Sequence, residues 1–257
     1  MTFIDTHTHL YSKEFDEDRT KAINSAIELG VSKFFLPNID QESIPGMLAL
    51  QKEFPNQCYP MLGLHPCSVG ENYKKDLLAI QALIPKTKII AVGEIGMDLF
   101  WDKSFQAAQK DAFIEQIQWA KTLKLPIVIH VRDAFDETFE VIDQLNDESL
   151  TGVFHCFTGD IDQANKIINY GGFKLGIGGV LTFKNSGLDK VIENVELKHL
   201  VLETDSPYLA PTPNRGKRNE SAYIPIIANK LSDIFGKNLN EIGKITSQNA
   251  LEVFQLT

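Results

Sequence analysis

The sequence has few cysteines, no surplus of positive charge and no long apolar run. Its three cysteines, Cys58, Cys67 and Cys156, are odd in number and lack metal-finger spacing, so we expect reduced thiols in a cytoplasmic protein. No apolar run is long enough to span a membrane, and the N-terminus lacks the basic and apolar regions of a signal peptide. A net charge of −9 argues against a broad basic surface for duplex nucleic acid. It allows nucleic acid in a small cleft, where bound divalent cations would reverse the local sign.

Length and patterning favour one α/β domain over residues 1–257, because no linker or low-complexity tract divides the chain. Short apolar runs predict strands at 3–5, 33–36, 59–64, 89–94, 127–131, 152–155, 173–177 and 200–203. The amphipathic stretches between them predict helices at 19–29, 43–54, 75–84, 104–123, 134–145, 161–170, 188–194, 221–235 and 239–254. We expect the last helix to break near Thr246. Eight alternations favour a (β/α)₈ TIM barrel, and a doubly wound open sheet is the alternative.

Metal-binding residue types follow several of the predicted strands. His7 and His9 are separated by one residue, so on a strand they would project from the same face. Thr8 would then point away from them and be the least constrained of the three. Four of the six histidines and two carboxylates occupy such positions, and these residues are His7, His9, Glu94, His130, His155 and Asp205. The C-terminal strand ends of a barrel meet on one face, so the sequence predicts a metal site there.

The number of ligands predicts two divalent ions. Four imidazoles and two carboxylates exceed the needs of one tetrahedral site. A glutamate can bridge two metals through its two oxygens, and Glu94 is the natural candidate. Two such ions can share a hydroxide and stabilise the attacking and leaving oxygens of phosphoryl transfer. Nitrogen-rich ligation suits Zn²⁺ or Mn²⁺, whereas Mg²⁺ prefers oxygen, and the sequence does not choose among them.

Six stretches, in order along nearly the whole chain, resemble the TatD-type metal-dependent deoxyribonucleases of the amidohydrolase-like barrels. They are IDTHTHL (4–10), GLHP (63–66), GEIGMD (93–98), PIVIHVRDA (126–134), HCFTG (155–159) and LETDSPYL (202–209). The resemblance implies a barrel, a divalent-metal centre and phosphodiester hydrolysis, with 3′→5′ exonuclease activity on DNA or RNA. It also implies the same six metal ligands. Residues 97–101 depart slightly from the usual pattern of the family, which could alter base stacking but leaves the metal ligands intact.

Four further residues receive roles in the predicted mechanism. Asp205 would orient the attacking water or take its proton. Glu94 and Glu203 are also predicted to take part in catalysis. Glu203 would support a ligand histidine or the attacking water, or it would be a polar residue of the barrel interior paired with a basic residue. His65 would donate to a substrate phosphate oxygen or pack at a turn. Arg132 would bind phosphate through its two-pronged guanidinium, form a salt bridge with Asp98 or Asp133, or do both.

The loop after the last strand predicts contact with a nucleic-acid backbone. It carries Arg215, Lys217 and Arg218 within four positions on an acidic protein, although a solvated turn is the alternative. Tyr208, and Phe100 with Trp101 in an earlier loop, would stack on unpaired bases or serve only in packing.

The expected function is a 3′→5′ exonuclease that prefers single-stranded DNA or RNA ends. One alternative is a hydrolase of a small ester, lactone or amide, but many such barrels bridge their metals with a carboxylated lysine where this chain has Glu94. Another is an aminoacyl-tRNA ester deacylase, and a third is a non-catalytic binding protein, against which the complete ligand set argues. We expect a monomer or weak oligomer with no membrane partner.

Overall fold

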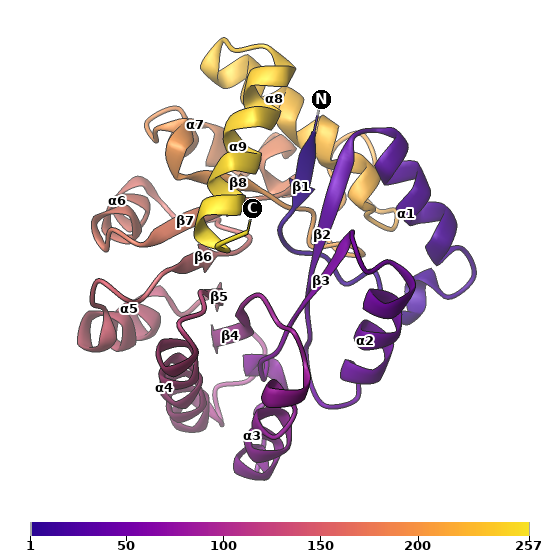
Figure 1. Cartoon of the computed structure of the whole chain (residues 1–257). Coiled ribbons are helices and arrows are strands. Elements are labelled where there is room, and N and C mark those ends of the chain that lie inside the picture. Colours follow the sequence, from indigo (N-terminus) through magenta and orange to yellow (C-terminus); the bar gives the residue numbers. More distant parts are fainter. Residues whose placement is uncertain (1, 257) are drawn as a thin grey trace.

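Eight strands alternate with helices around a closed ring in the computed structural model, which describes residues 2–256 (Figure 1). The strands are β1 (Phe3–Asp5), β2 (Val31–Pro37), β3 (Cys58–Met61), β4 (Val92–Asp98), β5 (Ile127–Arg132), β6 (Gly152–Phe154), β7 (Phe173–Ile177) and β8 (Leu200–Leu202). Neighbouring strands are parallel, in the orders β1-β2-β3 and β4-β5-β6-β7-β8.

Backbone hydrogen bonds close the two sheets into a barrel. Between β8 and β1, Thr6 N donates to Leu202 O at 3.0 Å and Asp205 N donates to His7 O at 2.9 Å. Between β3 and β4, Gly93 N donates to Leu62 O at 3.0 Å. The predicted (β/α)₈ barrel is therefore confirmed, and the open sheet is excluded.

The helices lie outside the strands, mostly within a few residues of their predicted bounds. They are α1 (Arg19–Glu28), α2 (Ile44–Glu53), α3 (Tyr73–Gln81), α4 (Gln106–Leu123), α5 (Phe135–Leu145), α6 (Ile161–Asn169), α7 (Leu188–Ile192), α8 (Ile224–Phe235) and α9 (Leu239–Val253). The expected break near Thr246 is wrong. Its hydroxyl donates to Ile242 O at 2.9 Å, one turn back, and α9 continues past it.

Strand β4 differs from its prediction in a way that matters for the site. It was expected at 89–94, but it begins at Val92 and continues to Asp98, so Glu94 lies inside the strand. Gly96 makes this extension possible, because a Cβ there would lie 2.1 Å from the backbone oxygen of His130 on β5. Its φ of +141° also suits glycine. The close approach of β4 to β5 brings Glu94 and His130 to the same end of the barrel.

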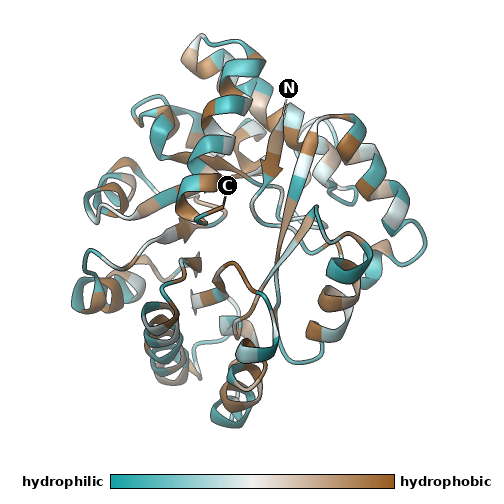
Figure 2. Cartoon of the chain, in the orientation of Figure 1, coloured by the Kyte–Doolittle hydropathy of each residue, from teal (hydrophilic) through white to brown (hydrophobic). Residues whose placement is uncertain are grey.

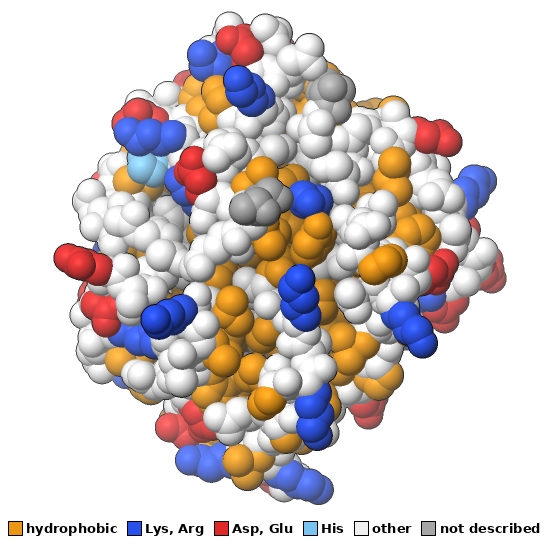
Figure 3. Space-filling view, in the orientation of Figure 1, with side chains coloured by type: hydrophobic (Ala, Val, Ile, Leu, Met, Phe, Trp, Pro, Cys, Tyr) orange, Lys and Arg blue, Asp and Glu red, His pale blue; other side chains and the backbone are white. Residues whose placement is uncertain are grey.

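The other end of the barrel is filled by apolar side chains and covered by α9, which crosses in front of the strands in Figure 1. Figure 2 shows the strands as largely hydrophobic. A buried cluster joins Ile4, Phe35, Val128 and Val201 of the strands to Phe254, just after α9. Figure 3 shows this end from outside, with hydrophobic side chains and a few basic ones in the middle of the view and charges of both signs towards the rim. Among residues 2–256, no helix is long and apolar enough to cross a bilayer.

Candidate metal centre

The open end of the barrel brings together all six predicted metal ligands. His7 and His9 follow β1, His130 lies on β5, His155 follows β6, and Asp205 follows β8. Thr8 between the first two histidines is not loosely constrained as expected. It is fully buried, and its hydroxyl lies 2.6 Å from Ser206 Oγ, which fastens β1 to the segment that carries Asp205. The histidine pair is therefore held rigidly against its carboxylate partner.

Glu94 is the centre of the group, and its Oε2 is on the side of His7, His9 and Asp205. His7 Nε2 lies 3.2 Å and His9 Nε2 lies 3.7 Å from this oxygen. The two Nε2 atoms are 3.3 Å apart. Asp205 Oδ1 completes the set at 3.7 Å from His7 Nε2 and 3.5 Å from His9 Nε2. Two imidazoles and two carboxylates thus surround one small volume.

The other oxygen of Glu94 faces the remaining ligands. Oε1 lies 2.8 Å from His130 Nδ1 and 2.7 Å from His155 Nε2, and these two nitrogens are 3.3 Å apart. His65 Nε2 approaches the same oxygen at 3.3 Å. One carboxylate therefore divides the histidines into two groups, as a bridging ligand would.

Hydrogen bonds behind the ligands fix which ring nitrogen carries the proton. Tyr11 donates its hydroxyl proton to Pro37 O, so its oxygen accepts from His9 Nδ1, which lies 2.8 Å away. The Nε2 lone pair of His9 then faces Glu94. In the same way, His130 Nε2 donates to Asp98 Oδ2 at 2.9 Å, and its Nδ1 lone pair faces the centre.

His65 has the opposite arrangement. Its Nδ1 accepts a hydrogen bond of 3.0 Å from the backbone N–H of Cys67, so the neutral ring carries its proton on Nε2. Burial, together with the neighbouring His130, lowers the pKa of His65 despite the opposing effect of Glu94, which favours this neutral form. His65 therefore offers an N–H donor to the centre, whereas His9 and His130 offer lone pairs.

The charges of the cluster depend on one another. Burial alone would raise the pKa of Glu94, but the surrounding histidines, His155 first, hold it well below its usual range. Burial alone would lower the pKa of His155, but Glu94 and Glu203 raise it well above normal. Burial likewise opposes the charged form of His130, and the neighbouring carboxylates of Asp98 and Glu94 outweigh that effect and raise its pKa. The cluster thus attracts positive charge, which divalent cations can also supply.

The donor set fits such cations. Ligating atoms of His7, His9 and Glu94 all lie within 4.8 Å of one another. Inward lone pairs on imidazole beside ionised carboxylates are the donors that Zn²⁺ and Mn²⁺ accept in proteins. The residues present therefore match a metal-binding function.

Glu203 lies behind His155 rather than in the group around Glu94. Its Oε1 accepts a 2.6 Å hydrogen bond from the backbone N–H of Cys156 and lies 3.6 Å from His155 Nδ1. Gly176 on β7 leaves room for this carboxylate, because a Cβ there would lie 2.1 Å from Glu203 Oε2. These contacts place Glu203 where it can position His155 and the turn after it.

Several residues support the metal ligands although the sequence did not predict that role for them. Tyr11 and Asp98 are two and four positions beyond His9 and Glu94, so the same-face spacing of a strand is the signal that indicates them. Two glutamines on α4 had no such signal. Gln109 exchanges two hydrogen bonds with the backbone of Asp98, at 2.9 and 3.0 Å. Gln116 does the same with Leu64, the residue before His65. Helix α4 thereby holds two of the site loops.

The predicted cations have different surroundings. Arg218 is engaged within the protein, with bonds of 2.7 and 2.8 Å to the two oxygens of Asp18 and of 2.9 Å to Glu220. Arg215 is exposed and lies over the Phe183 ring, with its Cζ 4.1 Å from the ring centroid. Lys217 is exposed in the same loop. The exposed cations of this loop are therefore Arg215 and Lys217.

Arg132 and Tyr208 lie beside the centre. The Arg132 Cζ is 3.8 Å from the centroid of the Phe100 ring, and no ion pair with an aspartate is found for this guanidinium among residues 2–256. Tyr208 is 48% exposed, and its ring centroid lies 6.1 Å from that of His9. Aromatic or cationic side chains thus border both sides of the Glu94 group.

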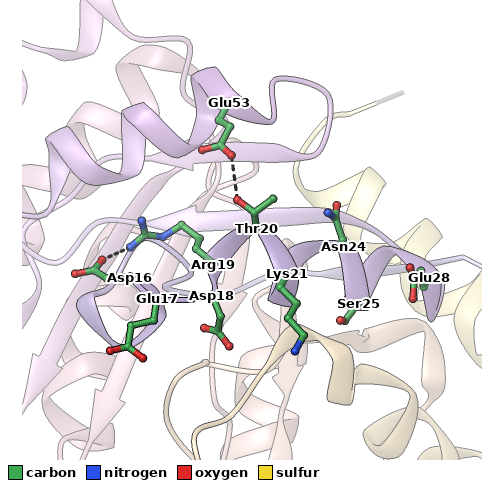
Figure 4. A pocket seen from close by; sticks show the side chains of 10 residues that line it. All are labelled: Asp16, Glu17, Asp18, Arg19, Thr20, Lys21, Asn24, Ser25, Glu28 and Glu53. Atoms are coloured by element: carbon green, nitrogen blue, oxygen red, sulfur yellow. Dashed lines mark hydrogen bonds and ion pairs between the residues drawn. The ribbon is translucent and has the colours of Figure 1, made fainter.

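A surface hollow of about 770 Å³ along the outer side of α1 is unrelated to this centre (Figure 4). Five acidic and two basic side chains line it, and Arg19 Nη2 lies 2.6 Å from Asp16 Oδ1. Thr20 donates across it to Glu53 at 3.2 Å. None of its lining residues belongs to the groups around Glu94, so we do not assign it a function.

Comparison with known proteins agrees with this geometry. A family model described as TatD related DNase matches residues 4–255. An uncharacterised metal-dependent hydrolase of Bacillus subtilis, YabD, is 34% identical over 98% of both chains. The 3′-5′ ssDNA/RNA exonuclease TatD of Yersinia pseudotuberculosis is 30% identical over 98% of this chain and 99% of its own. The crystal structure of YjjV, a TatD homologue of Escherichia coli, superposes with a TM-score of 0.92 at 29% identity, over 99% of this chain and 98% of its own. The chain therefore belongs to the TatD-related DNase family of metal-dependent hydrolases.

Proposed function

We propose that this protein hydrolyses phosphodiester bonds at the 3′ ends of single-stranded DNA or RNA, using two divalent cations. The observation that carries the proposal is the division of the ligands by Glu94, with His7, His9 and Asp205 on one side and His130 and His155 on the other. The exonuclease named among the relatives supports the choice of substrate. When bound, the cations would neutralise phosphate charge and make water a stronger nucleophile at neutral pH.

Asp205 is the best placed residue to take the proton of the attacking water. Its side chain is 14% exposed, against 2% for Glu94, so water reaches it more readily. Although burial would raise its pKa, the neighbouring His9, His7 and His155 lower it, and the carboxylate stays ionised. An ionised carboxylate at this position can orient water through a hydrogen bond and accept a proton.

His65 and the nearby cations would bind the phosphate groups. The Nε2–H of His65 points towards the oxygens of the centre, where a phosphate oxygen can accept it. Arg132 would contribute charge beside that phosphate, and Arg215 and Lys217 would contact the backbone of the strand further along. We assign Arg218 to holding this loop against Asp18 instead, because its guanidinium is already paired.

A cleavage assay tests the proposal. Metal-loaded protein would be incubated with 5′-labelled single- and double-stranded oligonucleotides of DNA and RNA, in Mg²⁺, Mn²⁺ or Zn²⁺. We expect a ladder that shortens from the 3′ end and is lost in His130→Ala. His199→Ala is the matched control, since His199 precedes β8 at the far end of the barrel and should leave cleavage unchanged. Turnover of small esters or aminoacyl esters without any cleavage of oligonucleotides would refute the proposal.

A further inference from the structure

We propose that Phe100, Trp101 and Arg132 form a platform on which an unpaired nucleobase stacks beside the metal centre. The inference rests on the proposed nuclease function and deepens it, because it names the part of the substrate that the protein recognises. We call these three residues the stacking platform.

The two aromatic rings of the platform are unusually exposed. Phe100 is 48% and Trp101 is 71% exposed, and their centroids are 4.8 Å apart at an interplanar angle of 88°. The second tryptophan of the chain, Trp119, is only 6% exposed and belongs to the core. Two adjacent rings left in water contribute little to folding, whereas exposed aromatic faces are what single-strand-binding sites use to hold bases.

Arg132 completes the platform with a planar cation. Its Cζ lies 3.8 Å from the Phe100 centroid and 5.1 Å from the Trp101 centroid. Within residues 2–256, the structure gives its guanidinium no hydrogen bond or ion pair. An arginine held over a ring can stack on a base and still donate from its edge to a phosphate. On a protein with a net charge of −9, an arginine without an acidic partner is suited to an anionic ligand.

Asp98 connects the platform directly to the metal centre. Its Oδ2 accepts from His130 Nε2 at 2.9 Å, and its Oδ1 accepts from the backbone N–H of Phe100 at 3.1 Å. Leu99 N also donates to Arg132 O at 2.9 Å, so the loop is fastened to β5 next to His130. The platform therefore begins two residues beyond Asp98, which orients a metal ligand, and lies within reach of a nucleotide whose phosphate lies at the centre.

A hollow of about 500 Å³ adjoins the platform and has the size of a small-ligand site. Phe100 and Arg132 line it together with Phe135, Thr158, Gln163 and the acidic Asp133 and Asp160. Together the ring faces and the hollow suit one unpaired nucleotide. A paired base is already stacked within a duplex and cannot present its face to the rings, so the platform accounts for a preference for single strands.

An abasic scan with metal-chelated protein tests this inference apart from cleavage. The probe is a fluorescein-labelled hexathymidylate, together with versions that lack the base at one position each, and binding is followed by anisotropy at low salt. We expect one or two positions at which loss of the base weakens binding about 10-fold. In Trp101→Ala and Phe100→Ala, the intact probe should bind as weakly as that abasic version does to the unmodified protein. Loss of the base at that position should then no longer weaken binding.

Conservative variants and a surface control separate stacking from charge and from folding. Trp101→Phe should retain most of the affinity, and Arg132→Lys should lose about as much as Arg132→Gln, because lysine keeps the charge but not the plane. Leu78→Ala removes another exposed apolar side chain, on α3, and should change nothing. Equal binding of every abasic probe, or no binding of the intact probe, would overturn the platform. A position-specific penalty without any cleavage by metal-loaded protein would refute the nuclease proposal and support the platform.

Discussion

Replacing Asp98 with asparagine should weaken metal binding without unfolding the protein. Asp98 is 2% exposed, and its hydrogen bond to His130 Nε2 outweighs the effect of burial and lowers its pKa to about 2. In Asp98→Asn, the single amide oxygen can accept either from His130 or from Phe100 N, but not from both with the geometry of two carboxylate oxygens. His130 then loses the charged acceptor that orients its ring and makes Nδ1 more basic.

The size of the effect follows from the role of such partners. Removing the hydrogen-bond partner of a ligand histidine typically costs 10- to 100-fold in metal affinity, or about 1.4–2.7 kcal/mol. Titration calorimetry with Mn²⁺ or Zn²⁺ on chelator-stripped protein would measure it. Asp111→Asn is the matched control, because Asp111 pairs with Tyr73 and Lys74 at the outside of the barrel. An unchanged affinity in Asp98→Asn would refute the reasoning, as would an equal loss in the control.

Three further substitutions test how the barrel holds the site, each by chemical denaturation. Arg218→Ala should lower the free energy of unfolding by about 1 kcal/mol at neutral pH. Because Arg218 lowers the pKa of Asp18, this loss should shrink as the pH falls below about 4, and a constant loss would contradict the assignment. Gly176→Ala should cost about 1–3 kcal/mol, since its Cβ would clash with Glu203, and a neutral effect would count against that packing. Phe254→Ala should cost about 3 kcal/mol by opening a cavity at the covered end of the barrel, and a loss below about 1 kcal/mol would argue against its place in the core.

The sequence was most informative where local pattern and barrel geometry coincide. Alternation of strand and helix gave the fold, and the parallel barrel then brought His7 and Asp205 together although they lie far apart in the chain. The exact extent of β4 could not be read from the sequence, because apolar residues at 89–91 resemble a strand while the pairing starts at Val92. The strand can continue through Gly96 because a residue without a Cβ lets the backbone of His130 come close, and this contact exists only in the folded protein.

Partners outside the ligand set were harder to predict. Nothing in the sequence indicates that Gln109 on α4 binds the backbone of Asp98, since this contact depends on how the helix packs on the barrel. The cations of the loop after β8 also have different surroundings, which composition cannot show. Arg218 meets Asp18 from the opposite end of the chain, whereas Lys217 is left exposed. The proton positions of His65 and His130 likewise follow from hydrogen bonds that exist only in the folded protein.

The most direct test of the account is a crystal structure of the protein with Mn²⁺, recorded at a wavelength that gives anomalous signal from the metal. The account predicts two anomalous peaks, one on each side of the Glu94 carboxylate and roughly 3.5–4 Å apart. One should lie against His7, His9 and Asp205, and the other against His130 and His155. A single peak, or peaks away from Glu94, would contradict the claim that this carboxylate bridges two metal sites.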